Sequence, residues 1–334
     1  MLFDVEIPTC REGVFVPVGF GGADAIATTV QKAEQFGYNA VWATDFLTPT
    51  PGYAVPDAGA PNWYEPLISL AFCAAKTKSI KLGTGVLLAP LRDPVILAKQ
   101  VATLDRFSNG RFLLGLGLGM CRDEYEAVRP RDRKARRGKL MDECIETLRL
   151  LLAHGEERPS YSGEYAAFNP IRLDPKPVQD PLPIYVPGRA TESLERAARF
   201  GLGLMVPAPM ARERLEALRP HAERFGRDVA EIDLIAEGEI RLARSHEQAV
   251  RDYRASRHGK FRVDIRGADF DQVLAANWIG TPDAVCDKID AVARHGVRHF
   301  NALHIAGDSM AERLEQMQMF AELVMAKMTH AVAA

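Results

Sequence analysis

The sequence predicts an α/β protein built as one (β/α)8 barrel, a TIM barrel, over residues 1–334, with insertion segments in the loops that follow strands. Eight apolar runs alternate along the chain with eight amphipathic stretches. Runs without a polar face suit a parallel sheet that is covered on both sides. At 334 residues and 47% hydrophobic content, the chain can bury a core of that size. A doubly wound parallel sheet is the alternative fold.

The predicted strands are short and continuously apolar, and the predicted helices place apolar residues three or four positions apart, as Ile26, Val30 and Ala33 do. We expect strands at Phe3–Ile7, Ala40–Ala43, Ile80–Leu88, Phe112–Leu118, Ile184–Val186, Leu202–Val206, Ile232–Leu242 and Phe300–Ile305. We expect helices at Ala25–Phe36, Glu65–Ala75, Val95–Phe107, Lys139–Leu152, Thr191–Phe200, Arg212–Phe225, Asp283–Arg294 and Ala311–Met328.

Four segments interrupt this alternation. They are residues 47–63, which are rich in Pro, Gly and Ala, residues 120–138 with a run of arginines, the proline-rich residues 155–183, and residues 258–278. In barrels the loops after strands carry the chemistry. We therefore expect these segments to shape a ligand site.

Composition and charge exclude several classes of function. The net charge of −2 gives no electrostatic footprint for nucleic acid or an anionic membrane. No run approaches the roughly 20 apolar residues of a membrane span, and residues 1–8 lack the pattern of a signal peptide. The five cysteines form no C-x-x-C pair, which argues against disulfides and a zinc knuckle. We expect a cytoplasmic protein that binds no metal, nucleic acid or membrane.

Glycines interrupt two of the apolar runs, where they weaken a strand by removing side chains that would pack. They are Gly83 and Gly85 in the third predicted strand and Gly115, Gly117 and Gly119 in the fourth. Sequences accept this where something flat must approach the backbone, and a planar cofactor ring is the candidate. The alternative is that Gly85 only makes room in a barrel layer. A dinucleotide fold is disfavoured because the run lacks G-x-G-x-x-G spacing.

Seven blocks, in one order along nearly the whole chain, resemble the luciferase-like monooxygenase superfamily, which comprises flavin and F-420 deazaflavin enzymes on a (β/α)8 barrel. The blocks are Ala33–Trp42; Pro66–Thr77 with Leu82–Gly85; Ala98–Arg111; Glu124-Tyr125 with Arg137-Gly138 and Asp142-Glu143; Leu182–Gly188; Ala197–Gly201; and Gly280–Asp283. The resemblance implies a non-proline cis peptide bond at Gly85–Val86, lying against the central ring of the cofactor. It also implies that Leu116, Gly117 and Gly119 border that ring.

A phosphate group of the cofactor has a candidate site where the fifth strand gives way to a helix, at Gly188, Arg189, Ala190 and Thr191. Free amides and the helix dipole favour anions there, and Arg189 can add a charge-assisted contact. The alternative is that Thr191 only caps the helix and Arg189 is a solvated surface residue.

Catalytic residues depart from the pattern of the relatives. Those enzymes commonly follow the second-strand aspartate with a histidine, whereas Phe46 follows Asp45 here. F-420 sugar dehydrogenases also carry a glutamate where this chain has Met120. Because hydride abstraction from an alcohol needs a general base, sugar dehydrogenation is disfavoured. Asp45 and His304 remain as catalytic candidates, with a buried structural role as the alternative for His304. Asp45 and Phe46 are also candidates for contacts with the cofactor. The candidates for a substrate pocket are Phe46, Trp63, Tyr64 and Met120.

Three functional hypotheses follow from the resemblance and these departures. The first is a monooxygenase that uses reduced FMN and dioxygen on a small organic molecule, with the flavin reduced by a separate reductase. The second is an oxidoreductase that transfers hydride with coenzyme F-420. The third is a catalytically silent flavin-binding or partner subunit. Relatives often pair, so we also expect a homodimer.

Overall fold

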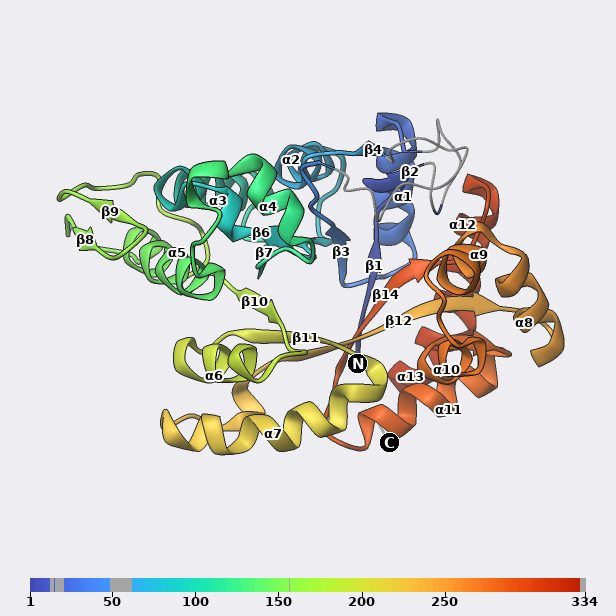
Figure 1. Ribbon diagram of the computed structural model, residues 1–334. Coiled ribbons are helices and arrows are strands. Elements are labelled where there is room, and N and C mark those ends of the chain that lie inside the picture. Colours follow the sequence, from blue (N-terminus) through green and yellow to red (C-terminus); the bar gives the residue numbers. More distant parts are fainter. Residues whose placement is uncertain (13–14, 16–20, 49–61, 156, 331–334) are drawn as a thin grey trace.

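The computed structural model describes residues 1–12, 15, 21–48, 62–155 and 157–330. Eight parallel strands close into a barrel in the order β10-β11-β12-β14-β1-β3-β5-β7, and β7 pairs with β10 to complete the ring (Figure 1). The (β/α)8 prediction is confirmed, and the doubly wound alternative is wrong. The barrel strands are β1 (Leu2–Glu6), β3 (Ala40–Ala43), β5 (Lys81–Thr84), β7 (Phe112–Gly117), β10 (Ile184–Pro187), β11 (Gly203–Pro207), β12 (Leu234–Leu242) and β14 (His299–Ile305).

Every barrel strand falls within or beside a predicted apolar run, because a strand covered on both faces needs apolar residues at successive positions. β7, for example, is buried along its whole length. The first and last strands, β1 and β14, lie side by side (Figure 1). Since all the strands are parallel, their carboxyl ends meet at one end of the barrel, named the mouth below.

The surrounding helices match the predicted amphipathic stretches to within two residues at their starts. Asp93 shows why such starts are predictable: its carboxylate accepts from the backbone N–H groups of Val95 and Ile96, and Pro94 takes the first helical position. The helices are α1 (Ala23–Gln35), α2 (Pro66–Lys76), α3 (Pro94–Ser108), α5 (Arg137–Leu152), α6 (Thr191–Phe200), α7 (Ala211–Arg224), α11 (Pro282–Ala293) and α12 (Met310–Phe320), which continues through the π-helical turn η7 (Ala321–Met325) into α13 (Ala326–His330).

The interrupting segments carry short elements of their own. Residues 49–61 lie outside the described residues, and β4 (Asn62–Trp63) pairs with β2 (Cys10–Glu12). A hairpin of β8 (Tyr161–Ser162) and β9 (Ala167–Phe168) projects from the barrel (Figure 1). The remaining elements are β6 (Leu87–Leu88), α4 (Arg122–Val128), α8 (His246–Ala255), α9 (Arg257–Lys260), the π-helical turn η6 (Phe261–Ile265), α10 (Phe270–Ala276) and β13 (Trp278–Gly280). No helix within the described ranges is long and apolar enough to span a membrane.

The end of the barrel opposite the mouth is closed by a polar network around His299, the first residue of β14. Its Nε2 lies 2.6 Å from Asp4 Oδ2, and its Nδ1 lies 2.8 Å from Asp233 Oδ2. Trp42 Nε1 and Asn39 Nδ2 also donate to Asp4, at 2.7 and 2.8 Å. Burial alone would lower the pKa of His299, but the two carboxylates outweigh it and raise that pKa to about 10. The imidazole is therefore a buried cation at neutral pH.

Candidate active site

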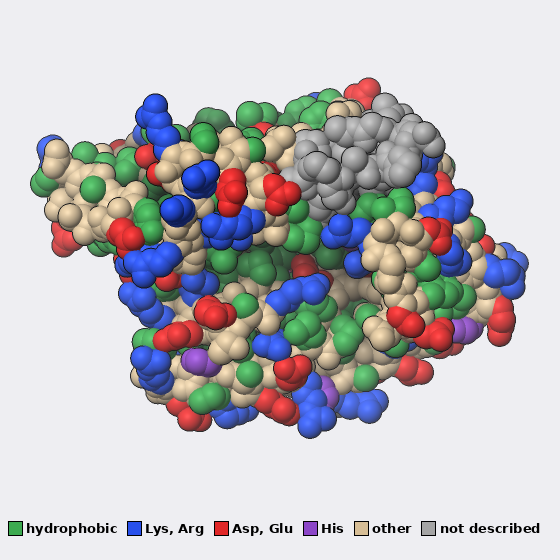
Figure 2. Space-filling model, viewed as in Figure 1, with side chains coloured by type: hydrophobic (Ala, Val, Ile, Leu, Met, Phe, Trp, Pro, Cys, Tyr) green, Lys and Arg blue, Asp and Glu red, His purple; other side chains and the backbone are tan. Residues whose placement is uncertain are grey.

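A cavity of about 520 Å³ opens at the mouth of the barrel, where proteins of this architecture place their active sites. The volume falls within the roughly 300–1,000 Å³ of small-molecule sites. In the space-filling view, a hollow near the centre of the face has hydrophobic side chains on its floor and basic side chains around its rim (Figure 2).

One wall of the cavity is backbone of low bulk from the ends of β5 and β7. The peptide bond Gly85–Val86 is cis, which confirms the expectation drawn from the resemblance. Both residues line the cavity together with Gly117 and Gly119. A Cβ on Gly117 would lie 2.3 Å from Val86 Cγ2, so the missing side chain is what admits Val86 at this place. The result is a flat wall.

The other two strand glycines serve the packing of the barrel itself. A Cβ on Gly83 would lie 2.3 Å from Trp42 Cε3, and a Cβ on Gly115 would lie 1.9 Å from the carbonyl oxygen of Thr84. Neither glycine lines the cavity. The expectation that these glycines make room for a ligand is therefore wrong for Gly83 and Gly115, which make room for a buried indole and a neighbouring strand.

The start of α6 forms a second wall, on the β10 side of the mouth. The helix begins at Thr191, as predicted, but the cap position belongs to Ala190, whose side chain makes no capping bond. The first amide groups of α6 are thus open to an anion. Arg189 is exposed, lines the cavity and makes no ion pair within the described residues, whereas Arg196 is paired with Asp142 at 2.6 Å.

Two acidic side chains anchor the loop after β3. Asp45 Oδ2 accepts a hydrogen bond from the backbone N–H of Leu88 in β6 at 2.8 Å, and it pairs with Arg92 Nη1 at 2.5 Å. Glu124 Oε1 accepts from the backbone N–H of Leu47 at 2.6 Å, and burial raises the pKa of this carboxyl group. Phe46, between the two anchored positions, lines the cavity beside Asp45.

His304, near the end of β14, brings an ionisable ring into the cavity wall. Its Nδ1 lies 2.5 Å from Glu6 Oε2 on the neighbouring strand β1. Glu6 also accepts from Cys10 Sγ at 3.3 Å, and both His304 and Glu6 are buried. A carboxylate bound to one ring nitrogen fixes the tautomer and the orientation of a histidine.

A second carboxylate–histidine pair lies next to the first. Glu239 on β12 is 1% exposed, its Oε2 lies 2.9 Å from His258 Nε2, and Tyr253 and Arg262 donate to its carboxylate. Burial would raise the pKa of Glu239, but His258 and Arg262 hold that pKa well below its usual range. The ring centroids of His258 and His304 are 4.9 Å apart. The mouth thus concentrates acid–base groups on three adjoining strands.

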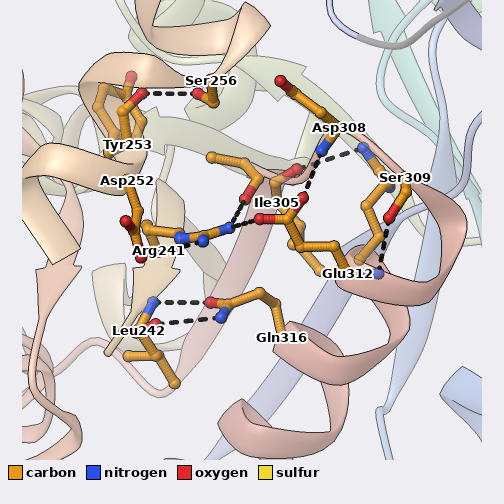
Figure 3. A network of polar contacts seen from close by, with 12 residues as sticks. Arg241, Leu242, Asp252, Tyr253, Ser256, Ile305, Asp308, Ser309, Glu312 and Gln316 are labelled. Carbon is orange, nitrogen blue, oxygen red and sulfur yellow. Dashed lines mark hydrogen bonds and ion pairs between the residues drawn. The ribbon is translucent and has the colours of Figure 1, made fainter. Parts of the chain in front are cut away.

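A polar network behind this wall fixes the segments that form it (Figure 3). Arg241 donates to the backbone carbonyl of Ala306, in the loop after β14, at 2.8 Å. It also forms ion pairs with Glu312 and, at 3.2 Å, with Asp252. Asp308, in the same loop, accepts from the backbone N–H of Arg257 at 3.0 Å. The β14 loop, α8 and the start of α9 are therefore tied together, which sets the position of η6.

The structure gathers most of the predicted site residues around this cavity. The wall contains Asp45, Phe46, Trp63, Gly85, Val86, Gly117, Gly119, Met120, Arg189, Ala190 and His304. The predicted residues outside it are Tyr64, Leu116, Gly188 and Thr191. Strand alternation accounts for Leu116, which is fully buried on the face opposite to Gly117. Gly188 packs inward, because a Cβ there would lie 2.6 Å from Val206 Cγ1.

Sequence reasoning missed the part of the wall that follows β12. Phe261 and Arg262 of η6, and Arg266 just after it, line the cavity. The segment 258–278 was predicted as an interruption, but nothing in its composition marks these residues as ligand contacts. Glu6 was also missed, although its place at the carboxyl end of the first strand is a signal, because such ends face the site in a barrel.

Comparison with known proteins agrees with this geometry. The model of the luciferase-like monooxygenase family matches residues 11–299. The chain belongs to this family. Among solved structures, the monooxygenase RslO1 from Streptomyces bottropensis superposes with a TM-score of 0.79 at 25% identity, covering 98% of this chain and 100% of that chain.

Two relatives of this luciferase-like protein represent two chemistries. The oxygenase component of a flavin-dependent trigonelline monooxygenase from Acinetobacter baylyi is 32% identical over 59% of this chain and 52% of that protein. An F420-dependent glucose-6-phosphate dehydrogenase from Amycolatopsis mediterranei is 28% identical over 92% of this chain and 95% of that protein. An uncharacterized Mycobacterium tuberculosis protein is 38% identical over 43% of this chain and 50% of that protein. The chain thus matches about half the length of the first and third of these relatives.

Proposed function

We propose that this protein is a flavin-dependent monooxygenase that uses reduced FMN and dioxygen to oxidise a small organic molecule. The observation that carries the proposal is one cavity that joins the flat wall at the cis bond Gly85–Val86 to the uncapped start of α6. A flat wall suits a fused ring system, and open amide groups suit a phosphate. Both features belong to FMN.

The residues that line the cavity are of the kinds that such a cofactor requires. Gly85, Val86, Gly117 and Gly119 would face the ring, and Arg189 with the first amide groups of α6 would hold the phosphate. When bound, a reduced flavin supplies the electrons that activate dioxygen. The task of the apolar wall is to exclude water from that region.

Proton transfer is assigned to His304 in this proposal. Its ring lines the cavity and Glu6 orients it through Nδ1, so His304 is the group placed to give a proton to the bound ligand or to take one from it. Asp45 receives a supporting role, because its Oδ2 already binds a backbone N–H and Arg92.

FMN is preferred over coenzyme F-420 because two positions of the wall are apolar. Phe46 and Met120 line the cavity at the two positions where the resemblance implies a histidine and a glutamate, so His304 alone would have to serve as the base for hydride abstraction. F-420-dependent hydride transfer is the second candidate, supported by the length of the match to the F420-dependent relative. A relative described as an oxygenase component supports a separate reductase as partner.

Two measurements test the proposal. Fluorescence quenching titrations with FMN and with F-420 determine which cofactor the purified protein binds. The protein loaded with reduced FMN is then mixed with air-saturated buffer in an oxygen electrode, against a panel of small organic molecules. Formation of an oxygenated product in place of hydrogen peroxide supports the monooxygenase, whereas binding of F-420 alone, without oxygen uptake, supports hydride transfer. Failure to bind either cofactor would indicate the silent partner subunit.

We also propose a homodimer through α2 and α3. Ile68 on α2 and Ile96 and Phe107 on α3 are 72%, 59% and 75% exposed, and they line one groove. Clustered exposed apolar side chains mark interaction surfaces. Light scattering on wild type and on Phe107→Lys tests this: a dimer that becomes a monomer is the expected result, and a monomeric wild type contradicts it.

A further inference from the structure

The run of arginines that follows β7 and α4 does not line the cavity. Between residues 129 and 137, six of the nine side chains are Arg or Lys and one is Asp. This stretch, named the basic turn, contains the 3-10 turn η3 (Pro130–Asp132) and leads into α5. Because the whole chain has a net charge of −2, the basic turn concentrates positive charge on a slightly acidic protein.

Hydrogen bonds hold the basic turn beside the mouth of the barrel. Within the turn, the backbone carbonyl of Asp132 accepts from Tyr125 Oη at 3.2 Å. At its end, Arg137 Nη1 donates to the backbone carbonyls of Leu118 and Gly119, at 3.3 and 3.2 Å. These two residues line the cavity. The basic turn is therefore fixed at the rim of the cavity.

Three side chains of the basic turn carry charge that no neighbouring carboxylate balances. Arg131, Arg133 and Lys134 are exposed, and their side chains form no ion pair within the part of the chain that the structure describes. Arg136, in the same turn, is by contrast paired with Glu164 at 2.5 Å. The three charges can therefore act on a ligand that approaches the mouth.

The start of α6 lies on the same side of the mouth as the end of the basic turn. Arg196 of α6 pairs with Asp142 of α5 at 2.6 Å, and it donates to the backbone carbonyl of Gly138 at 3.3 Å. Arg189, exposed and without an ion pair among the described residues, stands just before α6. Positive charge therefore extends from the basic turn to the uncapped start of this helix.

We propose that the basic turn is a steering surface, which draws the anionic cofactor from solvent toward the start of α6. This inference rests on the proposed function, in which the cofactor is FMN and its phosphate is the anionic group. Charges of one sign around a cleft raise the local concentration and the association rate of an oppositely charged ligand, by about 10- to 1,000-fold. The attraction extends over about 10 Å at 0.1 M salt, so the side chains need not touch the bound cofactor.

A steering surface and a direct contact with the phosphate differ in the rate constant that they change. Charges at the rim of a binding site act on association and on its dependence on salt, whereas a group that touches the bound ligand acts mainly on dissociation. Riboflavin has the flavin ring without the phosphate, so its association should not depend on the basic turn. A purely structural role of the turn would affect both flavins alike.

Stopped-flow mixing of the full-length protein with FMN or with riboflavin, followed by quenching of the flavin fluorescence, measures both rate constants. The test variant combines Arg131→Gln, Arg133→Gln and Lys134→Gln. The matched control removes the same number of Arg and Lys charges from segments that lead into β5, β12 and β14, away from the mouth, where the side chains are exposed and form no ion pair among the described residues: Lys78→Gln, Arg219→Gln and Arg294→Gln.

At low ionic strength, we expect FMN to associate with the test variant about tenfold more slowly than with wild type. The dissociation rate constant of FMN and the association of riboflavin should stay within about twofold of wild type. In about 1 M salt, where the screening length is about 3 Å, the two proteins should take up FMN equally fast. The proposal is overturned if the test variant takes up FMN as fast as wild type at low ionic strength, if riboflavin is slowed as much as FMN, or if the control variant is slowed equally.

The same mixing experiments separate this proposal from the proposed function. FMN binding at equal rates in wild type and in the test variant would remove the steering surface and leave the flavin. If wild type takes up F-420 and not FMN, slower uptake of F-420 by the test variant would leave the steering surface and remove FMN, whereas equal rates would remove both. A wild type that takes up neither cofactor would overturn both proposals.

Discussion

Two histidines on strand β14 make the same kind of bond at opposite ends of the barrel. His299 binds Asp4 of β1 and Asp233, and His304 binds Glu6 of β1. His299 has carboxylates at both ring nitrogens in a packed region, whereas His304 borders the cavity. A buried carboxylate–histidine pair is therefore no sign of function in itself. What distinguishes the two is whether space for a ligand adjoins the ring.

The largest effect on folding is expected at His299. His299→Gln removes the cation between two carboxylates, although Trp42 and Asn39 still donate to Asp4. We expect the free energy of unfolding at pH 7 to fall by about 3 kcal/mol, the low end for breaking a buried pair. Urea unfolding measures this, with exposed His295→Gln as the control. Equal stability of the two variants would show that His299 is not a structural cation.

The same histidine predicts how stability depends on pH. Its folded-state pKa, about 10, lies above the roughly 6.5 of an unfolded chain. A raised folded pKa means that the contribution is fully present below pH 6.5 and is lost as the pH rises through about 10. The stability difference between wild type and His299→Gln should therefore narrow steadily between pH 6.5 and 10. A constant difference over that range would contradict the raised pKa.

His304→Gln should reduce turnover strongly and stability only slightly. Since the ring borders the cavity, we expect its loss to cost only about 1 kcal/mol of stability, the net value of a typical hydrogen bond. Turnover of the substrate found in the oxygen-uptake panel should fall about 100-fold, the low end for a general acid or base. FMN affinity should stay within twofold of wild type. An unchanged turnover would return His304 to a structural role like that of His299.

The sequence predicted the frame of the barrel because each element is determined locally. A strand covered on both faces must be apolar throughout, and a helix that packs on it must repeat apolar residues at helical spacing. α3 shows this completely, with Asp93 capping its start and Pro94 in its first turn. The sequence did not predict the helices α8, α9 and α10. Their sequence is polar, and few apolar positions pack on the barrel, so the helical spacing of apolar residues is weak there.

The candidate site was predictable only where backbone or strand position determines it. Gly85, Val86 and Gly117 could be placed because the glycine pattern belongs to strands whose ends must meet at the mouth. Phe261 and Arg266 could not, because their approach depends on how the loop after β12 folds back over the barrel. Gly83 and Gly115 were misread, since a glycine that admits a neighbouring protein group has the same sequence signature as one that admits a ligand.

Two glycines, Gly83 in the packed interior and Gly117 at the mouth, allow the same comparison, and we expect smaller effects from their substitution. Gly83→Ala would place a Cβ against the buried Trp42 indole, and we expect a loss of about 1–3 kcal/mol in unfolding free energy, as for other overpacked cores. Gly117→Ala displaces Val86, which can move toward the cavity, so the change should appear as about tenfold weaker FMN binding with a smaller loss of stability. Urea unfolding and FMN fluorescence titration on both variants, with Gly22→Ala as an unhindered control, separate the two cases. Weakened FMN binding in the Gly83 variant but not in the Gly117 variant would mean that the flat wall is not the cofactor's surface.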